Sequence, residues 1–311
     1  MKLSTTTGDF KVGLMQIEEQ IHWISKTGFK HINLELTSED ANARLCNDDW
    51  EERITSIGKA MKDAGLDAVQ AHSCCESLTE IGYDWMVEET RRNIIACDRL
   101  GIPDLVVHPL YKTGMSARAV YDFNKNFYND LLSAVPDSKT HLLLENMADT
   151  ECSVPGFASG YELADFLDWM GNDRLGACLD TAHVNLNKPP RDNQYESIKA
   201  LGPWLRALHV SDNFGKNLHW HSIPFNGNIN FDSVMCGLLE VGYKGAFNFE
   251  ASYILRNSKM PPTRRKEWTN PNDPNFVPKL FEPGVEMKVL IDQTLYGVGK
   301  YILEQYGVFE E

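Results

Sequence analysis

The sequence has no hydrophobic run approaching the roughly 20 residues that a membrane-spanning helix needs. Its first residues, Met1–Thr7, also lack the apolar core of a secretory signal peptide. From these two absences we expect a cytoplasmic protein that has no membrane partner.

Cysteine is sparse, and its spacing suggests no pairing. The chain has 7 cysteines, an odd number, and no two of them form a Cys-x-x-Cys pair. This pattern favours free thiols in a reducing compartment over a disulfide framework. It also argues against a structural zinc site built from cysteines alone.

Positively charged residues are fewer than negatively charged ones. Lys and Arg number 30 against 44 Asp and Glu, which gives a formal net charge of -14 and a pI of about 5.1. Because nucleic-acid binding needs a clustered positive field, we expect no nucleic-acid partner. Hydrophobic residues make up 42% of the chain, which is enough for a globular core.

Short apolar runs alternate with helical patterns from one end of the chain to the other. The predicted strands are Leu3–Thr7, His31–Leu36, Ala68–His72, Leu105–His108, His141–Glu145, Gly176–Asp180, Ala207–Val210 and Ala246–Glu250. The predicted helices are Met15–Ser25, Trp50–Ala64, Trp85–Leu100, Ala117–Val135, Gly160–Met170, Gln194–Leu201, Phe231–Val241 and Val285–Tyr306. Such a repeat predicts one α/β domain over residues 1–311, a (β/α)8 TIM barrel.

An open doubly wound sheet is the alternative fold. It is disfavoured because no Gly-rich phosphate-binding fingerprint follows the first strand.

One segment interrupts the alternation of strands and helices. It is the proline-rich stretch Ser252–Pro283, which also carries the basic run Arg264–Lys266. We expect it to be an extended rim loop, and a substrate lid, a subunit contact and a solvated excursion all remain open.

Four acidic or imidazole side chains stand at the C-terminal ends of separate predicted strands: Glu145, Asp180, His209 and Glu250. In a parallel barrel these strand ends meet at one rim. Three carboxylates brought together there would repel one another unless a cation neutralised them. The four residues therefore predict a site for one divalent metal ion. An oxygen-rich set with a single imidazole favours Mn²⁺, and Mg²⁺, Co²⁺ or Zn²⁺ are also possible.

Further polar and aromatic side chains fall at the same predicted rim. They are His72, His108, His183, His219, His221, Trp220 and Phe225. His72 and His108 could each face substrate or support the structure, and the two aromatic residues could stack on a sugar or only pack at the barrel edge. Since three carboxylates leave a divalent site about one charge negative, the ligand we expect is a neutral polyol rather than a phosphate.

Several motifs resemble those of the xylose isomerase-like TIM barrel superfamily, the sugar phosphate isomerases and epimerases. They are Leu144-Glu145-Asn146, Leu179-Asp180-Thr181-Ala182-His183, His209-Val210-Ser211-Asp212-Asn213 and the later His221 with Gly227-Asn228-Ile229. The resemblance spans nearly the whole chain. It implies that Glu145, Asp180, His209 and Glu250 are metal ligands, that Glu145 and Glu250 also act as acid and base, and that His183 touches a substrate oxygen. His72, His108, His221 and Trp220 are the remaining predicted substrate-binding residues.

The resemblance implies an isomerase or epimerase that works through an enediolate. A lyase that cleaves oxidised C-glycosides by elimination, with a small partner subunit, is the alternative, and the 252–283 segment could serve such a partner. A third reading is an apurinic endonuclease, which would enlist His72, His108, His183 and His221 for several zinc ions. That reading is weakened because His219 stands where many relatives have Asp. A sugar-binding barrel without catalysis is the fourth. The partners expected are a sugar or sugar conjugate and either a second copy of the chain or a small subunit.

Overall fold

The structure is a computed structural model. It describes residues 1–311 apart from 11–14, 37–44, 74–81, 113, 149–155, 188–192, 216–219, 252–268, 274 and 277–283. Most of the predicted extended loop, Ser252–Pro283, therefore lies outside the described residues. His219 also lies outside them.

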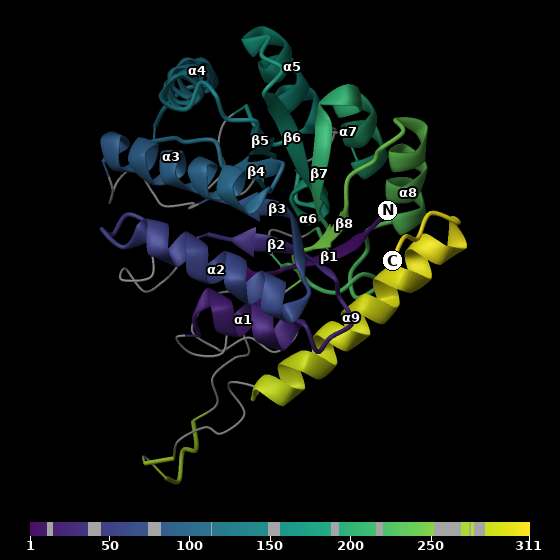
Figure 1. The fold of residues 1–311 in the computed structure, drawn as a ribbon. Helices are drawn as coiled ribbons and strands as arrows, with labels where there is room; N and C mark the ends of the chain where they lie inside the picture. The colour runs from purple at the N-terminus through teal and green to yellow at the C-terminus, as the bar shows by residue number, and fades with distance from the viewer. Residues whose placement is uncertain are drawn as a thin grey trace.

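Eight parallel strands form a barrel (Figure 1). They are β1 (Leu3–Thr6), β2 (His31–Glu35), β3 (Asp67–His72), β4 (Asp104–Val107), β5 (His141–Glu145), β6 (Leu175–Asp180), β7 (Leu205–His209) and β8 (Phe247–Phe249). Neighbouring strands pair in chain order, and β8 pairs with β1. The last gap closes where Val210 N donates to Asn248 O at 2.8 Å and Glu250 N donates to Val210 O at 3.2 Å. The predicted TIM barrel is confirmed.

Helices surround the strands (Figure 1). They are α1 (Ile17–Ile24), α2 (Trp50–Ala64), α3 (Tyr83–Leu100), α4 (Ala117–Ala134), α5 (Gly160–Met170), α6 (Thr181–Asn185), α7 (Gln194–Leu201), α8 (Phe231–Glu240) and α9 (Val285–Gln305), with the 3-10 turns η1 (Thr7–Asp9) and η3 (Gly202–Trp204). No described helix is long and apolar enough to cross a membrane. All eight predicted helices are present within a few residues, and the short helix α6 is an addition.

Local signals explain where the helices begin and end. Ser159 accepts a hydrogen bond from the Glu162 N–H, and the Glu162 carboxylate accepts one from the Ser159 N–H, so a capping box starts α5. Gly65 and Gly101 close α2 and α3 at φ angles of 64° and 71°, a left-handed conformation that favours glycine. These caps return the chain to the N-terminal end of the barrel, from which the next strand starts.

An apolar layer fills the barrel interior on one side. Val106, Leu143, Cys178 and Ala207 are buried together and come from the adjacent strands β4 to β7. Side chains two residues apart on a strand face the same way. Leu143, Cys178 and Ala207 therefore form an apolar floor beneath the side chains that end β5, β6 and β7.

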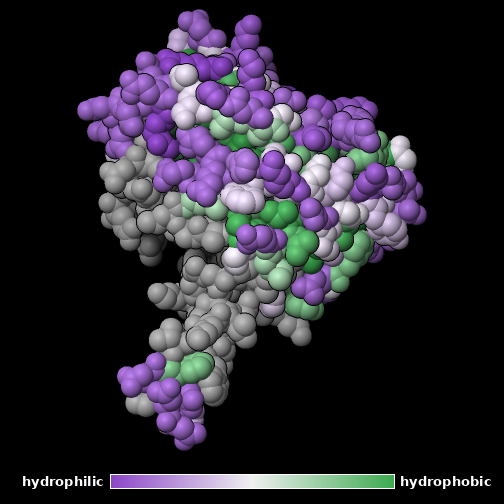
Figure 2. Space-filling view, turned by 60° about the horizontal axis from the view of Figure 1, so that its bottom comes forward, coloured by the Kyte–Doolittle hydropathy of each residue, from purple (hydrophilic) through white to green (hydrophobic). Residues whose placement is uncertain are grey.

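On the face shown in Figure 2, hydrophilic side chains predominate and a smaller apolar area interrupts them. Helix α9 contributes exposed apolar side chains, among them Leu290 at 55% and Tyr301 at 57% exposure. The expected second copy of the chain or small partner subunit stays a prediction.

Candidate metal centre

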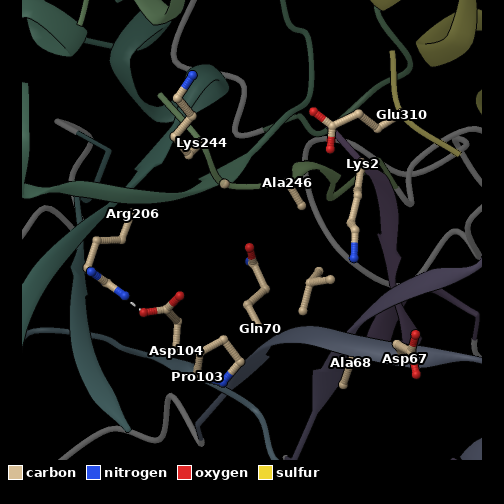
Figure 3. A pocket seen from close by; sticks show the side chains of 12 residues that line it. Lys2, Asp67, Ala68, Gln70, Pro103, Asp104, Arg206, Lys244, Ala246 and Glu310 are labelled. Carbon is tan, nitrogen blue, oxygen red and sulfur yellow. Dashed lines mark hydrogen bonds and ion pairs between the residues drawn. The ribbon is translucent and has the colours of Figure 1, made fainter. Parts of the chain in front are cut away.

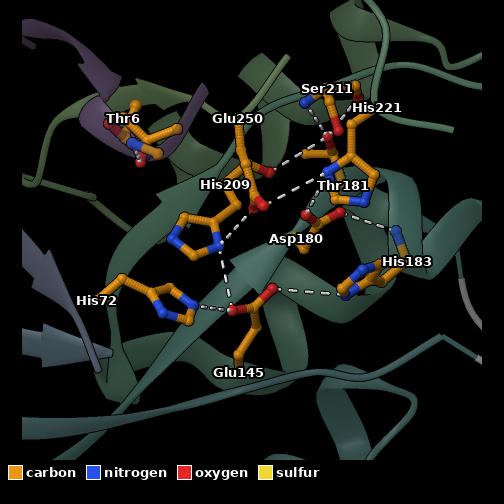
Figure 4. Close-up of polar contacts among 12 residues, drawn as sticks. Thr6, His72, Glu145, Asp180, Thr181, His183, His209, Ser211, His221 and Glu250 are labelled. Carbon is orange, nitrogen blue, oxygen red and sulfur yellow. Dashed lines mark hydrogen bonds and ion pairs between the residues drawn. The ribbon is translucent and has the colours of Figure 1, made fainter. Parts of the chain in front are cut away.

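The four predicted metal ligands converge at the C-terminal rim (Figure 4). Glu145, Asp180 and His209 are the last residues of β5, β6 and β7, and Glu250 follows β8 directly. Each offers a ligand atom within 4.8 Å of those offered by the other three. We call these four residues the ligand cluster. Glu145, Asp180 and His209 are almost fully buried, whereas the Glu250 side chain is 30% exposed.

His209 lies between the two glutamates. Its Nδ1 is 3.1 Å from Glu145 Oε2 and 3.0 Å from Glu250 Oε2. One ring nitrogen therefore faces a carboxylate from β5 and another from the end of β8, strands that are far apart in the chain. This arrangement places both candidate acid–base groups around a single point.

Asp180 is held in place by its local structure. Its Oδ1 accepts a 2.8 Å hydrogen bond from the His183 N–H and so caps the start of α6. Its own N–H donates to Asn146 Oδ1 at 2.7 Å, and Asn146 Nδ2 donates to its carbonyl at 3.2 Å. The backbone of Asp180 is thus fixed on both sides, and its second carboxylate oxygen is left for another partner.

Burial and mutual repulsion shift the pKa values of the carboxylates in different directions. Burial and the nearby Glu145 raise the pKa of Asp180 to about 7. Burial likewise raises the pKa of Glu250, against the opposing effect of His209. Although burial acts to raise it, the pKa of Glu145 is held well below its usual range by His209 and His108. A bound cation would favour the ionised form of all three.

The donor set fits a divalent ion. Glu145 Oε1 and Asp180 Oδ2 are buried and hydrogen-bond to no described residue. Because an unsatisfied buried carboxylate oxygen is costly, both atoms suit a cation. Three carboxylates and one imidazole are ligands that Mn²⁺ and Mg²⁺ accept and that Co²⁺ and Zn²⁺ tolerate.

The predicted substrate-binding histidines surround the ligand cluster. His72 Nε2 and His108 Nε2 lie 3.3 Å and 3.1 Å from Glu145 Oε2. His183 Nδ1 lies 2.7 Å from Asn146 O and 3.5 Å from Glu145 Oε1. The structure therefore brings His72, His108 and His183 onto the same glutamate.

His221 and Trp220 approach from the loop after β7. His221 Nδ1 is 3.8 Å from both Asp180 Oδ2 and Glu250 Oε1. Asp180, His183 and His221 form a second buried group whose ligand atoms lie within 4.8 Å of one another. Trp220 packs edge-on against Phe214, with ring centroids 6.2 Å apart, and its buried indole Nε1 has no hydrogen-bond partner among the residues that the structure describes. Its predicted contact with substrate stays a prediction.

Sequence reasoning missed two residues near the centre. Glu35 ends β2, and its Oε1 is 3.7 Å from His72 Nδ1. It follows the same rule of an acid at a strand end, but the strand was predicted to run on to Leu36. Asn146 was quoted only as part of a motif. Nothing local indicates that its amide reaches the backbone of the next strand.

A pocket of about 370 Å³ lies at the end of the barrel opposite the ligand cluster, where the strands begin (Figure 3). Gln70 points into it, and Arg206 Nε donates to Asp104 Oδ1 at 2.7 Å on its wall. Lys2 and Glu310 also line it, so its charges are mixed. None of the predicted site residues lines this pocket, and the candidate chemistry belongs to the other end.

Known proteins resemble this chain in sequence or in fold. The chain is 25% identical over 272 residues to the uncharacterized protein y4fM of Sinorhizobium fredii, covering 78% of this chain and 84% of that one. Its fold resembles a D-psicose 3-epimerase solved with D-fructose, at 17% identity and a TM-score of 0.72, covering 97% and 99% of the two chains. It also resembles a 3-keto-D-glucoside 4-epimerase from E. coli, at 15% identity and a TM-score of 0.62, covering 81% and 92%.

A sequence profile of one family matches residues 21–267, which include β2 to β8 and all four residues of the ligand cluster. The match agrees with the closed eight-stranded barrel and with the motifs at the strand ends. The chain therefore belongs to the xylose isomerase-like TIM barrel family.

Proposed function

We propose that this protein is a divalent-metal-dependent carbohydrate epimerase or isomerase that acts through an enediolate. The observation that carries the proposal is the convergence of Glu145, Asp180, His209 and Glu250 within 4.8 Å at the strand ends of a xylose isomerase-like barrel. Fold likeness to sugar epimerases supports the choice of substrate class.

The ligand cluster would hold one ion, with Mn²⁺ favoured by its oxygen-rich donors. When bound, the ion would supply Lewis-acid polarisation of a ketose carbonyl and its neighbouring hydroxyl. Proton transfer would fall to Glu145 and Glu250, which face the same His209 nitrogen. Without the ion their pKa values are shifted in opposite directions, and a bound ion would favour the ionised form of both.

Glu145 and Glu250 would divide the proton transfer between them. Glu145, ionised by its histidine neighbours, takes the proton from the carbon next to the carbonyl. Glu250, whose side chain is 30% exposed, takes up a proton from solvent and returns it from the other face. Return to the same carbon gives epimerisation, and return to the adjacent carbon gives isomerisation. His183 and His221 stand on the side of Asp180 and would bind substrate oxygens, with Trp220 beside them.

Solvent-proton exchange into a ketose tests the proposal. The metal-loaded protein is incubated in D₂O with D-fructose, D-psicose, D-tagatose and L-ribulose in turn, and deuterium at the carbons beside the carbonyl is followed by NMR. We expect exchange with at least one sugar, and its loss by about 10³-fold or more in Glu145→Gln and Glu250→Gln. The exposed Glu286→Gln is the matched control. No exchange with any ketose would refute the proposal and favour a binding protein.

Elimination from an oxidised glycoside is the second candidate. It is favoured by the fold likeness to an enzyme that acts on a 3-keto-glucoside. The same enediolate would expel a leaving group from the next carbon instead of regaining a proton there. A 3-keto-glucoside with a chromogenic aglycone separates the two functions, because only elimination releases the aglycone.

A phosphodiesterase that uses several metal ions is a further candidate function. It is favoured by the second buried group that could hold an ion, which consists of Asp180, His183 and His221. Elemental analysis decides this point. One ion per chain supports a sugar epimerase or lyase, and two or three zinc ions per chain would support the phosphodiesterase.

A further inference from the structure

A buried carboxylate next to the site anchors the loop that carries His221. Asp212 is fully buried three residues beyond His209. Its Oδ2 accepts a hydrogen bond from the Gly227 N–H at 2.9 Å, and its Oδ1 accepts one from the Ile229 N–H at 3.1 Å. Its backbone also pairs in both directions with Ser222, at 2.9 Å each way. His221 therefore precedes a residue that is fixed to Asp212.

The anchor tolerates little change of shape. A Cβ on Gly227 would lie 2.3 Å from both Asp212 Oδ1 and Asn213 O, so only glycine fits there. Phe225 holds a φ of 73°, which is rare for a side chain of this size, and strain of this kind persists only where surrounding bonds impose it. Ser222, Gly227 and Ile229 are thus all held by hydrogen bonds to Asp212.

The same anchor reaches the helix that carries His183. Asn213 Nδ2 donates to Ala182 O at 2.9 Å, and Asn185 Nδ2 lies 2.8 Å from Asn213 Oδ1 and 2.7 Å from Asn228 Oδ1. One set of polar bonds therefore joins α6 to the 212–229 loop. His183 belongs to α6 and His221 to the loop, and their rings lie 5.2 Å apart.

We propose that Asp212, Asn213 and Asn185 form a positioning unit that sets the His183 and His221 rings relative to Asp180. None of its three residues belongs to a described group that could hold a metal ion. It acts through the His183 and His221 imidazoles. Their role as substrate-binding groups rests on the proposed function. It fixes the relative positions of two side chains that come from different segments of the chain.

Asp212→Asn and Asn185→Ala test the proposal from its two ends. Asparagine at 212 keeps the shape but leaves an NH₂ group facing one of the two N–H donors. We expect the ring ¹⁵N resonances of both His183 and His221 to move in each variant of the metal-free protein, with assignments from His183→Gln and His221→Gln. Asp168→Asn and Asn129→Ala, which change exposed side chains of the same types, should leave them in place. Unchanged resonances in both anchor variants would overturn the proposal.

Binding separates a positioning role from general destabilisation. We expect the affinity for D-fructose to fall about tenfold in Asp212→Asn while Mn²⁺ affinity stays within about threefold, since a lost hydrogen bond to a charged group is commonly a factor of ten. Equal loss of sugar and ion affinity would mean that the loop only supports the fold, and would also overturn the proposal. If the unmutated protein does not bind D-fructose, the affinity is measured with D-psicose, D-tagatose or L-ribulose instead. If it binds none of the four ketoses, the proposed function is in question, and the ring resonances alone decide the positioning role.

Discussion

Asn146 and Asp180 are joined by two hydrogen bonds across neighbouring strands. The Asn146 side chain accepts from the Asp180 N–H at 2.7 Å and donates to the Asp180 carbonyl at 3.2 Å. Asn146 is fully buried, and its own carbonyl contacts His183 Nδ1 at 2.7 Å. A single amide therefore fixes the backbone of Asp180, whose carboxylate belongs to two of the three candidate metal groups among the described residues.

This contact predicts the effect of Asn146→Ala. Two backbone groups of Asp180 would lose their partner in a buried place, which costs about 1–3 kcal/mol of stability. We expect Mn²⁺ affinity to fall about 10- to 100-fold, the usual range for the outer contacts of a metal ligand. Calorimetric titration measures it, and the exposed Asn126→Ala should bind the ion as the unmutated protein does.

The apolar floor gives a second prediction. Leu143 is fully buried two residues before Glu145, so Leu143→Ala would leave a cavity under the carboxylate. We expect a loss of about 2–5 kcal/mol in the free energy of unfolding, together with weaker ion binding as Glu145 gains freedom. Urea denaturation of the metal-free protein checks the first effect. Leu290→Ala, at a position that is 55% exposed, should cost far less.

Ion binding should depend on pH with a defined sign. The pKa of Asp180 is raised to about 7, so below that pH the carboxyl holds a proton that a cation must displace. We expect apparent Mn²⁺ affinity to fall as pH drops from 8 to 6, and proton release per ion to rise. Titration in buffers of different ionisation enthalpy measures the protons released. An affinity that does not change over this range would contradict the prediction.

Stability of the metal-free protein should change with pH in the opposite sense. A carboxyl whose pKa is raised by folding stabilises the folded state most at low pH, and this contribution is lost as pH rises toward about 7. We expect the Tm of the metal-free protein to fall between pH 6 and 8. Mn²⁺ should raise the Tm more at pH 8 than at pH 6, because the ion binds the ionised form.

Glu35 offers a test of the charge on His72. Burial lowers the pKa of His72, but Glu35 and Glu145 outweigh it and raise the value to about 9. We expect Glu35→Gln to shift that pKa back toward 6.5, the ordinary value for histidine. NMR titration of the His72 ring measures the shift. Glu304→Gln, at the far end of α9, should leave the ring unchanged.

The amino-acid sequence by itself predicted the alternation of strands and helices and the convergence of four polar residues at one rim, whose role as metal ligands stays a prediction. These are local properties: hydrophobic period, glycine at helix ends, and an acid or imidazole as the last residue of an apolar run. A parallel barrel implies a shared rim, and for this reason the order of residues along the chain was enough to group Glu145, Asp180, His209 and Glu250.

Only the tertiary structure decided how these side chains meet. Asn146 reaches Asp180 because β5 and β6 are adjacent, although the two residues are 34 positions apart. Asp212 gathers amides from a loop whose path has no periodic pattern, and Glu35 lies beside His72 through the register of β2 and β3. Such contacts depend on strand register and loop closure, which arise from packing across the whole barrel and leave no signal in the neighbouring residues.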